Sequence, residues 1–105
     1  MTVVTVYAVF ADGAEAQRIG MTIVEERLAA CVNILPPCRS IYRWEGAIEQ
    51  ATESPALFKT TTDKVDALIA RATELHSYTV SAIAVWAIER LPTDYADWVE
   101  ASVTG

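Results

Sequence analysis

Residues 31–48 read CVNILPPCRSIYRWEGAI and residues 55–62 read PALFKTTT, and together they occupy the middle of the chain. Proline has no backbone N–H to donate to a sheet, so Pro36-Pro37 predicts a bulge or an edge position there. Gly46 takes positive φ without steric cost, which predicts a reversal over residues 44–47. The middle of the chain is therefore predicted to be extended, with one interruption and one reversal.

Helical patterns flank this extended region on both sides. Asp12 is a predicted N-cap for a helix from about Gly13 to Ala30, and Thr62 or Asp63 caps a second helix. Apolar residues recur at helical spacing in the second helix; they are Val65, Leu68, Ile69, Ala72 and Leu75. Strands are predicted over 2–11 and 78–88, and a short helix over 94–102. The order β, α, β, β, α, β predicts an α+β, ferredoxin-like sandwich with an added C-terminal helix, in which both main helices cover one sheet face.

The second face of this sheet is also largely apolar. Alternation along the first strand places two sets of side chains on opposite faces: Val4, Val6, Ala8 and Phe10 on one, Val3, Thr5, Tyr7 and Val9 on the other. Two helices cannot cover both faces, and a bare apolar face of this size marks association. We therefore expect a homo-oligomer.

Composition bounds the class of protein. The chain has 105 residues, of which 52% are hydrophobic, and its 8 basic and 14 acidic side chains give a net charge of −6. It is expected to be a single domain, residues 1–105. The apolar content excludes disorder, and no apolar run is long enough for a membrane span. A pI near 4.6 means that the chain lacks the basic surface that nucleic acid binding requires. Residues 2–11 lack signal-peptide features, so we expect a cytoplasmic protein whose two cysteines are thiols.

Several motifs resemble the CutA divalent-cation tolerance family. They lie between Leu28 and Thr61 and in two later segments: AACVN at 29–33, SIYRWEG at 40–46, KTT at 59–61, His76 with Tyr78, and YADW at 95–98. The resemblance implies a ferredoxin-like subunit in a tight homotrimer, with long hairpins pairing across subunits. It also implies a role in tolerance to copper and other divalent cations, and no catalysed reaction. The family's usual His-Pro-Tyr-Glu-x-Pro-Glu is here HSYTVSA, residues 76–82, which lacks two prolines and two acidic groups.

Three residues are candidate metal contacts: Cys31, His76 and Glu45. A thiolate suits copper(I) or zinc, and three copies of Cys31 could converge in a trimer; alternatively this cysteine is a small buried hydrophobe. His76 is the only histidine, and it is either a ligand or proton carrier, or a helix C-cap. One histidine cannot make a two-histidine site in a chain, so a metal would recruit Cys31, an acidic residue such as Glu45 or Glu53, or another subunit.

Four further residues are candidate contacts in an inter-subunit cleft: Lys59, Trp44, Tyr78 and Arg43. Lys59 either binds an anion, or snorkels or pairs with Glu45 or Glu49. The aromatic residues either line a pocket or belong to the core or an interface.

The sequence favours a non-enzymatic, metal-responsive protein. It has no nucleophile elbow, glycine-rich phosphate loop or H-E-x-x-H motif, so we expect no enzyme and no organic cofactor. The expected partners are copper or another divalent cation and two further copies of the chain. The alternative is a PII-like trimeric signalling scaffold that binds a small anionic metabolite or a partner protein in its clefts, in which Lys59 and Arg43 would matter most.

Overall fold

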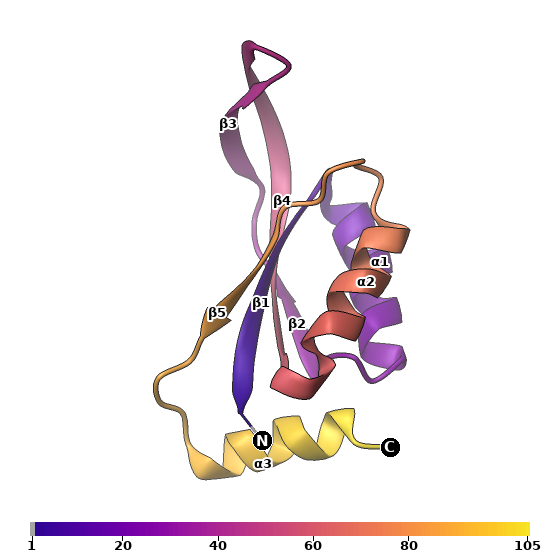
Figure 1. The fold of residues 1–105 in the computed structure, drawn as a ribbon, viewed down its shortest axis with the longest axis vertical. Helices are drawn as coiled ribbons and strands as arrows, with labels where there is room; N and C mark the ends of the chain where they lie inside the picture. Colours follow the sequence, from indigo (N-terminus) through magenta and orange to yellow (C-terminus); the bar gives the residue numbers. More distant parts are fainter. Residues whose placement is uncertain (1) are drawn as a thin grey trace.

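The computed structural model describes residues 2–105 and has the element order that the sequence predicts (Figure 1). The elements are β1 (Val3–Phe10), α1 (Gly13–Glu25), β2 (Cys31–Ile34), β3 (Cys38–Trp44), β4 (Ala47–Thr61), the 3-10 turn η1 (Thr62–Lys64), α2 (Val65–Leu75), β5 (Ile83–Ala87) and α3 (Thr93–Val103). The prolines divide the second predicted strand into β2 and β3.

The sheet is antiparallel, with strand order β2-β4-β1-β5, and β3 pairs with the first half of β4. Helices α1 and α2 lie side by side on one face, while β3 and β4 project beyond the body as a two-stranded ribbon (Figure 1). This arrangement confirms the predicted ferredoxin-like α+β fold.

The ribbon ends in the predicted reversal. Trp44 pairs with Ala47, and the two residues between them, Glu45 and Gly46, have φ of 50° and 82°. Positive φ at both central positions is the geometry of a type I′ hairpin turn, whose twist matches that of the flanking strands. Strand β4 then continues from Ala47 without a break, so it begins eight residues before the predicted strand at 55.

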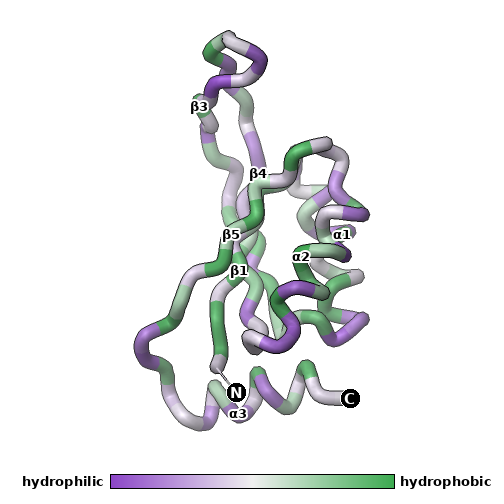
Figure 2. Tube along the Cα trace, in the orientation of Figure 1, coloured by the Kyte–Doolittle hydropathy of each residue, from purple (hydrophilic) through white to green (hydrophobic). Residues whose placement is uncertain are grey.

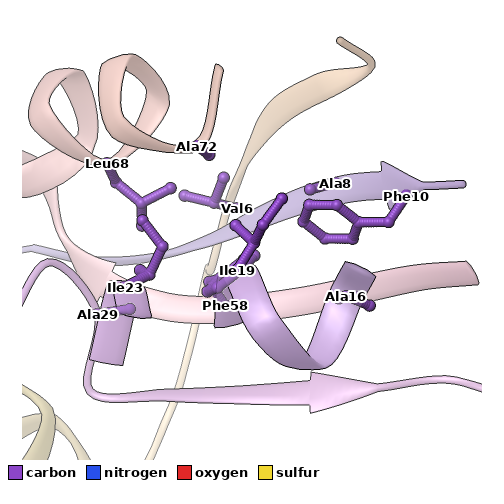
Figure 3. Packing of buried hydrophobic residues seen from close by; sticks show 11 residues of the cluster. Val6, Ala8, Phe10, Ala16, Ile19, Ile23, Ala29, Phe58, Leu68 and Ala72 are labelled. Atoms are coloured by element: carbon purple, nitrogen blue, oxygen red, sulfur yellow. The ribbon is translucent and has the colours of Figure 1, made fainter. Parts of the chain in front are cut away.

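The hydrophobic core lies between the sheet and the two helices (Figure 3). The sheet contributes alternate residues of β1 and β4, and the helices contribute one apolar stripe each. The buried members are Val6, Ala8, Phe10, Ala16, Ile19, Ile23, Ala29, Ala56, Phe58, Leu68 and Ala72. The rings of Phe10 and Phe58 meet edge to face, with centroids 6.5 Å apart.

Helix α1 ends at Glu25, five residues before its predicted end at Ala30, because the chain makes a left-handed C-cap. Arg27 has φ of 60°, its N–H donates to the carbonyl of Val24, and the N–H of Leu28 donates to Ile23. These two bonds define a Schellman motif, in which the residue at positive φ is usually glycine. Because this chain has arginine instead of glycine at this position, the sequence did not indicate the helix end.

Strand β5 is also shorter than predicted, since residues 78–82 are not part of it. The backbone N–H groups of Ser77 and Tyr78 donate to the side chains of Glu15 and His76 rather than to a neighbouring strand. The predicted strand over 78–88 was therefore wrong in its first half, apart from one ladder bond from the N–H of Val9 to the carbonyl of Ala82.

The second sheet face is partly covered by α3. Val3 of β1 and Ala30 pack with Val99 and Val103 of this helix at one end of the face. The outer strand β5 stays open, and Figure 2 shows hydrophobic colour along it and along β1. Trp86 of β5 is 48% exposed although its ring stacks on Tyr7 at 4.8 Å.

Candidate functional site

A groove of about 750 Å³ lies between the β3–β4 ribbon, the second face of β1 and the segment 77–82. Its lining includes four aromatic and two acidic residues. The residues that line it are Tyr7, Val9, Ser40, Ile41, Tyr42, Trp44, Glu49, Glu53, Ser77, Tyr78, Thr79, Val80 and Ala82. Two predicted cleft residues, Trp44 and Tyr78, are therefore brought together here.

The ribbon register explains how its residues reach the groove. Tyr42 pairs with Glu49 and Cys38 pairs with Glu53, so these residues share one face of the ribbon with Trp44. The opposite face carries Arg43, whose partner is Ile48. Arg43 does not line the groove, although Ile41 on the same ribbon face does.

Tyr78 and Glu53 form the polar contact of the groove. The Tyr78 hydroxyl donates to Glu53 Oε2 at 2.8 Å, and Glu53 is only 8% exposed. Burial, together with the hydrogen bond to the Glu53 carboxylate and its charge, raises the pKa of Tyr78 to about 12. The phenol therefore keeps its proton at neutral pH and remains a donor.

His76 anchors the segment that carries Tyr78. Its Nδ1 accepts the Tyr78 backbone N–H at 3.0 Å, and its Nε2 lies 2.8 Å from the carbonyl oxygen of Val9. An Nδ1 that accepts a hydrogen bond is unprotonated, so the proton is on Nε2 and is donated to Val9. The ring also stacks on Phe10 at 5.2 Å and is buried. Both nitrogens are occupied, and a metal would have to displace one of these bonds.

Glu15 holds the same segment from the first turn of α1. Its carboxylate accepts the N–H of Ser77 and the N–H of Ala11, each at 2.9 Å, while its own N–H donates to the N-cap Asp12. Burial acts to raise the pKa of Glu15, but the hydrogen bonds from Ser77 and Ala11 outweigh it, and the net shift is downward. The capping pattern predicted at Asp12 thus also fixes residue 77.

Cys31 lies elsewhere, in a row of residues across the second sheet face. The register aligns Cys31 of β2 with Lys59 of β4, and Lys59 with Thr5 of β1. The Cys31 Sγ lies 3.9 Å from the hydroxyl of Tyr95 on α3, and burial, followed by the contact with Cys31, raises the pKa of Tyr95. Lys59 is half-buried and forms no ion pair with any residue in 2–105.

The three candidate metal contacts occupy three different places in one chain. Cys31 is in β2, His76 follows α2, and Glu45 is in the exposed turn of the ribbon. Across residues 2–105, no group of three or more histidine, cysteine, aspartate or glutamate side chains could hold a metal ion. One chain therefore does not fit a mononuclear metal site by itself.

Sequence reasoning named Tyr42 among the aromatic residues that either line a pocket or belong to the core or an interface, but it did not find Glu49 as a groove residue and considered Glu53 only as an auxiliary ligand. Their common signal is the register of the ribbon, which is set by the turn at Glu45-Gly46. Counting pairs back from that turn places Tyr42 opposite Glu49 and Cys38 opposite Glu53.

The structure defines a small ferredoxin-like protein with a groove beside its sheet. The model of the CutA1 divalent ion tolerance protein family matches residues 4–102, and the chain belongs to this family. That membership confirms the family that the motifs predicted.

Individual relatives are similar to this chain over most of their length. The divalent-cation tolerance protein CutA of Pectobacterium atrosepticum is 39% identical over 92 residues, covering 88% of this chain and 84% of that protein. The CutA of Thermus thermophilus is 45% identical over 84 residues, covering 80% and 82%. Among solved structures, CutA from Xylella fastidiosa superposes with a TM-score of 0.95 at 33% identity, covering 99% of this chain and 100% of that chain.

A further solved structure bears on location. The CutA of Archaeoglobus fulgidus, described as a periplasmic divalent cation tolerance protein, has a TM-score of 0.94 at 36% identity and covers 97% of this chain and 99% of that chain. In residues 2–105 no helix is both long enough and apolar enough to cross a bilayer. The cytoplasmic location stays a prediction.

Proposed function

We propose that this protein is a non-enzymatic, homotrimeric, metal-responsive protein that acts in tolerance to copper or other divalent cations. The observation that carries the proposal is membership of the CutA1 family over residues 4–102, which is nearly the whole chain. The relatives that match it are named for divalent-cation tolerance rather than for a reaction.

Assembly is supported by apolar surface that one chain leaves uncovered. Trp86 is 48% exposed on β5, and on the ribbon Ile41 and Ile48 are 66% and 59% exposed. An isolated two-stranded ribbon is marginally stable in water, so packing against other copies would stabilise it. Burial of these side chains between subunits also accounts for the high apolar content of so short a chain.

Metal contact is proposed at Cys31, with donors supplied by more than one subunit. Its thiol is half-buried on the second sheet face, where subunits would meet, and thiolate donors favour copper(I) or zinc. His76 would contribute only by giving up a hydrogen bond, and Glu45 would contribute from the ribbon turn.

The PII-like alternative, a scaffold for a small anion, rests on Lys59 and Arg43. Neither residue lines the groove, whose charged lining residues are Glu49 and Glu53. An anion in this groove would therefore meet two carboxylates and no basic side chain.

The test is calorimetric titration of the reduced, metal-free protein with copper(I), copper(II) and zinc. Cys31→Ser should abolish or strongly weaken the binding, while Cys38→Ser, which removes a thiol on the ribbon, should leave it intact. His76→Ala and Glu45→Gln measure the remaining two contacts. Absence of binding by the unaltered protein, or equal binding by the Cys31 and Cys38 variants, would remove the metal part of the proposal.

A further inference from the structure

We propose that Glu15 and His76 form a clamp that holds segment 77–82 as a loop and prevents it from lengthening strand β5. The clamp consists of four hydrogen bonds, each made inside one chain by groups that are buried or part-buried. The inference depends neither on the metal contact proposed at Cys31 nor on how open the groove is in the assembled protein. It determines where Tyr78 lies, because this residue is part of the segment.

Both clamp residues bond to the end of strand β1. Alternate residues of β1 direct their backbone groups towards β5, and Val9 is one of them, since its N–H donates to the carbonyl of Ala82. The carbonyl of Val9 accepts from His76 Nε2 at 2.8 Å. The next N–H on that side, from Ala11, donates to Glu15 Oε2 at 2.9 Å. Two side chains therefore occupy the positions at which a longer β5 would pair with β1.

The same two side chains hold the start of the segment. Oε1 of Glu15 accepts the N–H of Ser77 at 2.9 Å. Nδ1 of His76 accepts the N–H of Tyr78 at 3.0 Å. Each side chain thus bridges β1 and the segment, with one polar atom on each. Loss of either side chain releases a backbone group on the strand and another on the segment.

The segment also has the sequence of a strand. Residues 78–82 read YTVSA, in which tyrosine, threonine and valine favour extended structure and none is proline. Continuing the β1–β5 register sets Val9 opposite Ala82, and these two residues already share one ladder bond. The second bond of such a pair runs from the N–H of Ala82 to the carbonyl of Val9, which His76 occupies. The segment therefore has two states, a clamped loop and a strand, and the clamp selects the loop.

The clamp fixes the position of Tyr78. In the clamped loop the Tyr78 hydroxyl donates to Glu53 Oε2 at 2.8 Å. Lengthening β5 shortens the connection from α2 and removes the acceptor of the Tyr78 N–H, so residue 78 has to shift. The contact between Tyr78 and Glu53 therefore reports which state the segment occupies.

The test is amide hydrogen exchange, measured by NMR at pH 7 on the assembled protein, in the unaltered chain and in His76→Phe. Phenylalanine keeps an aromatic ring on Phe10 but has neither nitrogen. The amides of Ser77 and Tyr78 should exchange at least about tenfold faster in the variant, and that of Ala82 at least about tenfold slower. An Ala82 amide that is unchanged or faster would overturn the proposal, because the segment would then only fray. Unchanged amides at Ser77 and Tyr78 would overturn it as well, because other contacts would then hold the segment.

Two further variants separate the clamp from a general effect of charge or packing. Glu15→Gln keeps the size of the side chain, but its amide group can accept only one of the two N–H groups. It should shift the same amides in the same directions, and it carries the test if His76→Phe does not fold. The matched control is Glu25→Gln, which removes an exposed charge on α1 and should leave the exchange rates unchanged. Equal changes in Glu15→Gln and in the control would contradict the clamp.

Tyrosinate titration gives a second readout of the same variant. In His76→Phe the pKa of Tyr78 should fall from about 12 towards its ordinary value of 10.0, because the hydroxyl leaves Glu53. A pKa of Tyr78 that stays near 12 in this variant would show that its position does not depend on the clamp, and would contradict the proposal.

Discussion

Side-chain hydrogen bonds, rather than a sheet ladder, hold the segment after α2. The N–H of Ser77 is committed to Glu15 and that of Tyr78 to His76, and the Tyr78 hydroxyl reaches Glu53. A proline at position 77, as in the related motif, has no N–H for the bond to Glu15. In this chain the N–H of Ser77 donates that bond. A hydrogen bond therefore positions residue 77, where the related motif has a rigid proline.

Part of the site could be predicted from residue types alone. Trp44 and Tyr78, predicted in an inter-subunit cleft, line a groove within one chain, and the inter-subunit cleft itself stays a prediction. The pairing of Tyr78 with Glu53 could not be predicted, because the two residues are far apart in sequence and meet only through the fold. His76 shows the converse case, in which a chemically versatile residue has both nitrogens engaged in backbone contacts.

Ultraviolet absorbance titration of tyrosinate tests the Tyr78 contact. Its folded-state pKa of about 12 lies above the ordinary value of 10.0, so the fold favours the neutral phenol. The resulting stability is fully present below pH 10 and is lost as the pH rises towards 12. The difference between the titration curves of the unaltered protein and Tyr78→Phe should show one tyrosine ionising near 12, and Glu53→Gln should lower that pKa. Ionisation of Tyr78 at its ordinary pKa would contradict the contact.

At the scale of elements, local sequence signals predicted the order of the helices and strands and most of the positions at which they start. The prolines, Gly46 and Asp12 each act through their own backbone or side chain, so their effects are visible in the sequence. The helix and strand boundaries that the sequence did not predict depend on backbone geometry and on contacts with other elements. Helix α1 stops at a left-handed Arg27, and β5 starts late because residues 77 and 78 donate to side chains of other elements.

Replacing Arg27 with glycine should stabilise the C-cap of α1. A residue other than glycine at φ of 60° costs about 1 kcal/mol, which glycine avoids. Arg27 also donates to the carbonyl of Ser102 at 3.2 Å, so the proper control is Arg27→Ala, which loses that bond but keeps the strain. Urea unfolding at fixed protein concentration should give Arg27→Gly a free energy of unfolding about 1 kcal/mol above that of Arg27→Ala. An equal or lower value would show that the left-handed residue is not strained.

At the scale of the whole molecule, the chain combines one covered sheet face with one that α3 covers only at its end. Sequence alternation predicted the two apolar faces correctly, but it did not predict that the C-terminal helix would cover Val3 and Ala30. The remaining apolar surface lies on β5 and on the ribbon. A trimer would carry a charge of −18, three times the −6 of the chain, which attracts cations of every kind without selecting among them. Selection would then depend on the individual sites.

Light scattering of the purified protein tests most directly the assembly on which the proposed function depends. We predict a mass of three 11.5 kDa chains at micromolar concentration. Trp86→Glu, which places a charge on the open strand β5, should lower the mass towards that of one chain, whereas Thr73→Glu on the exposed side of α2 should not. A single-chain mass for the unaltered protein, or a trimer unaffected by Trp86→Glu, would contradict assembly through this surface.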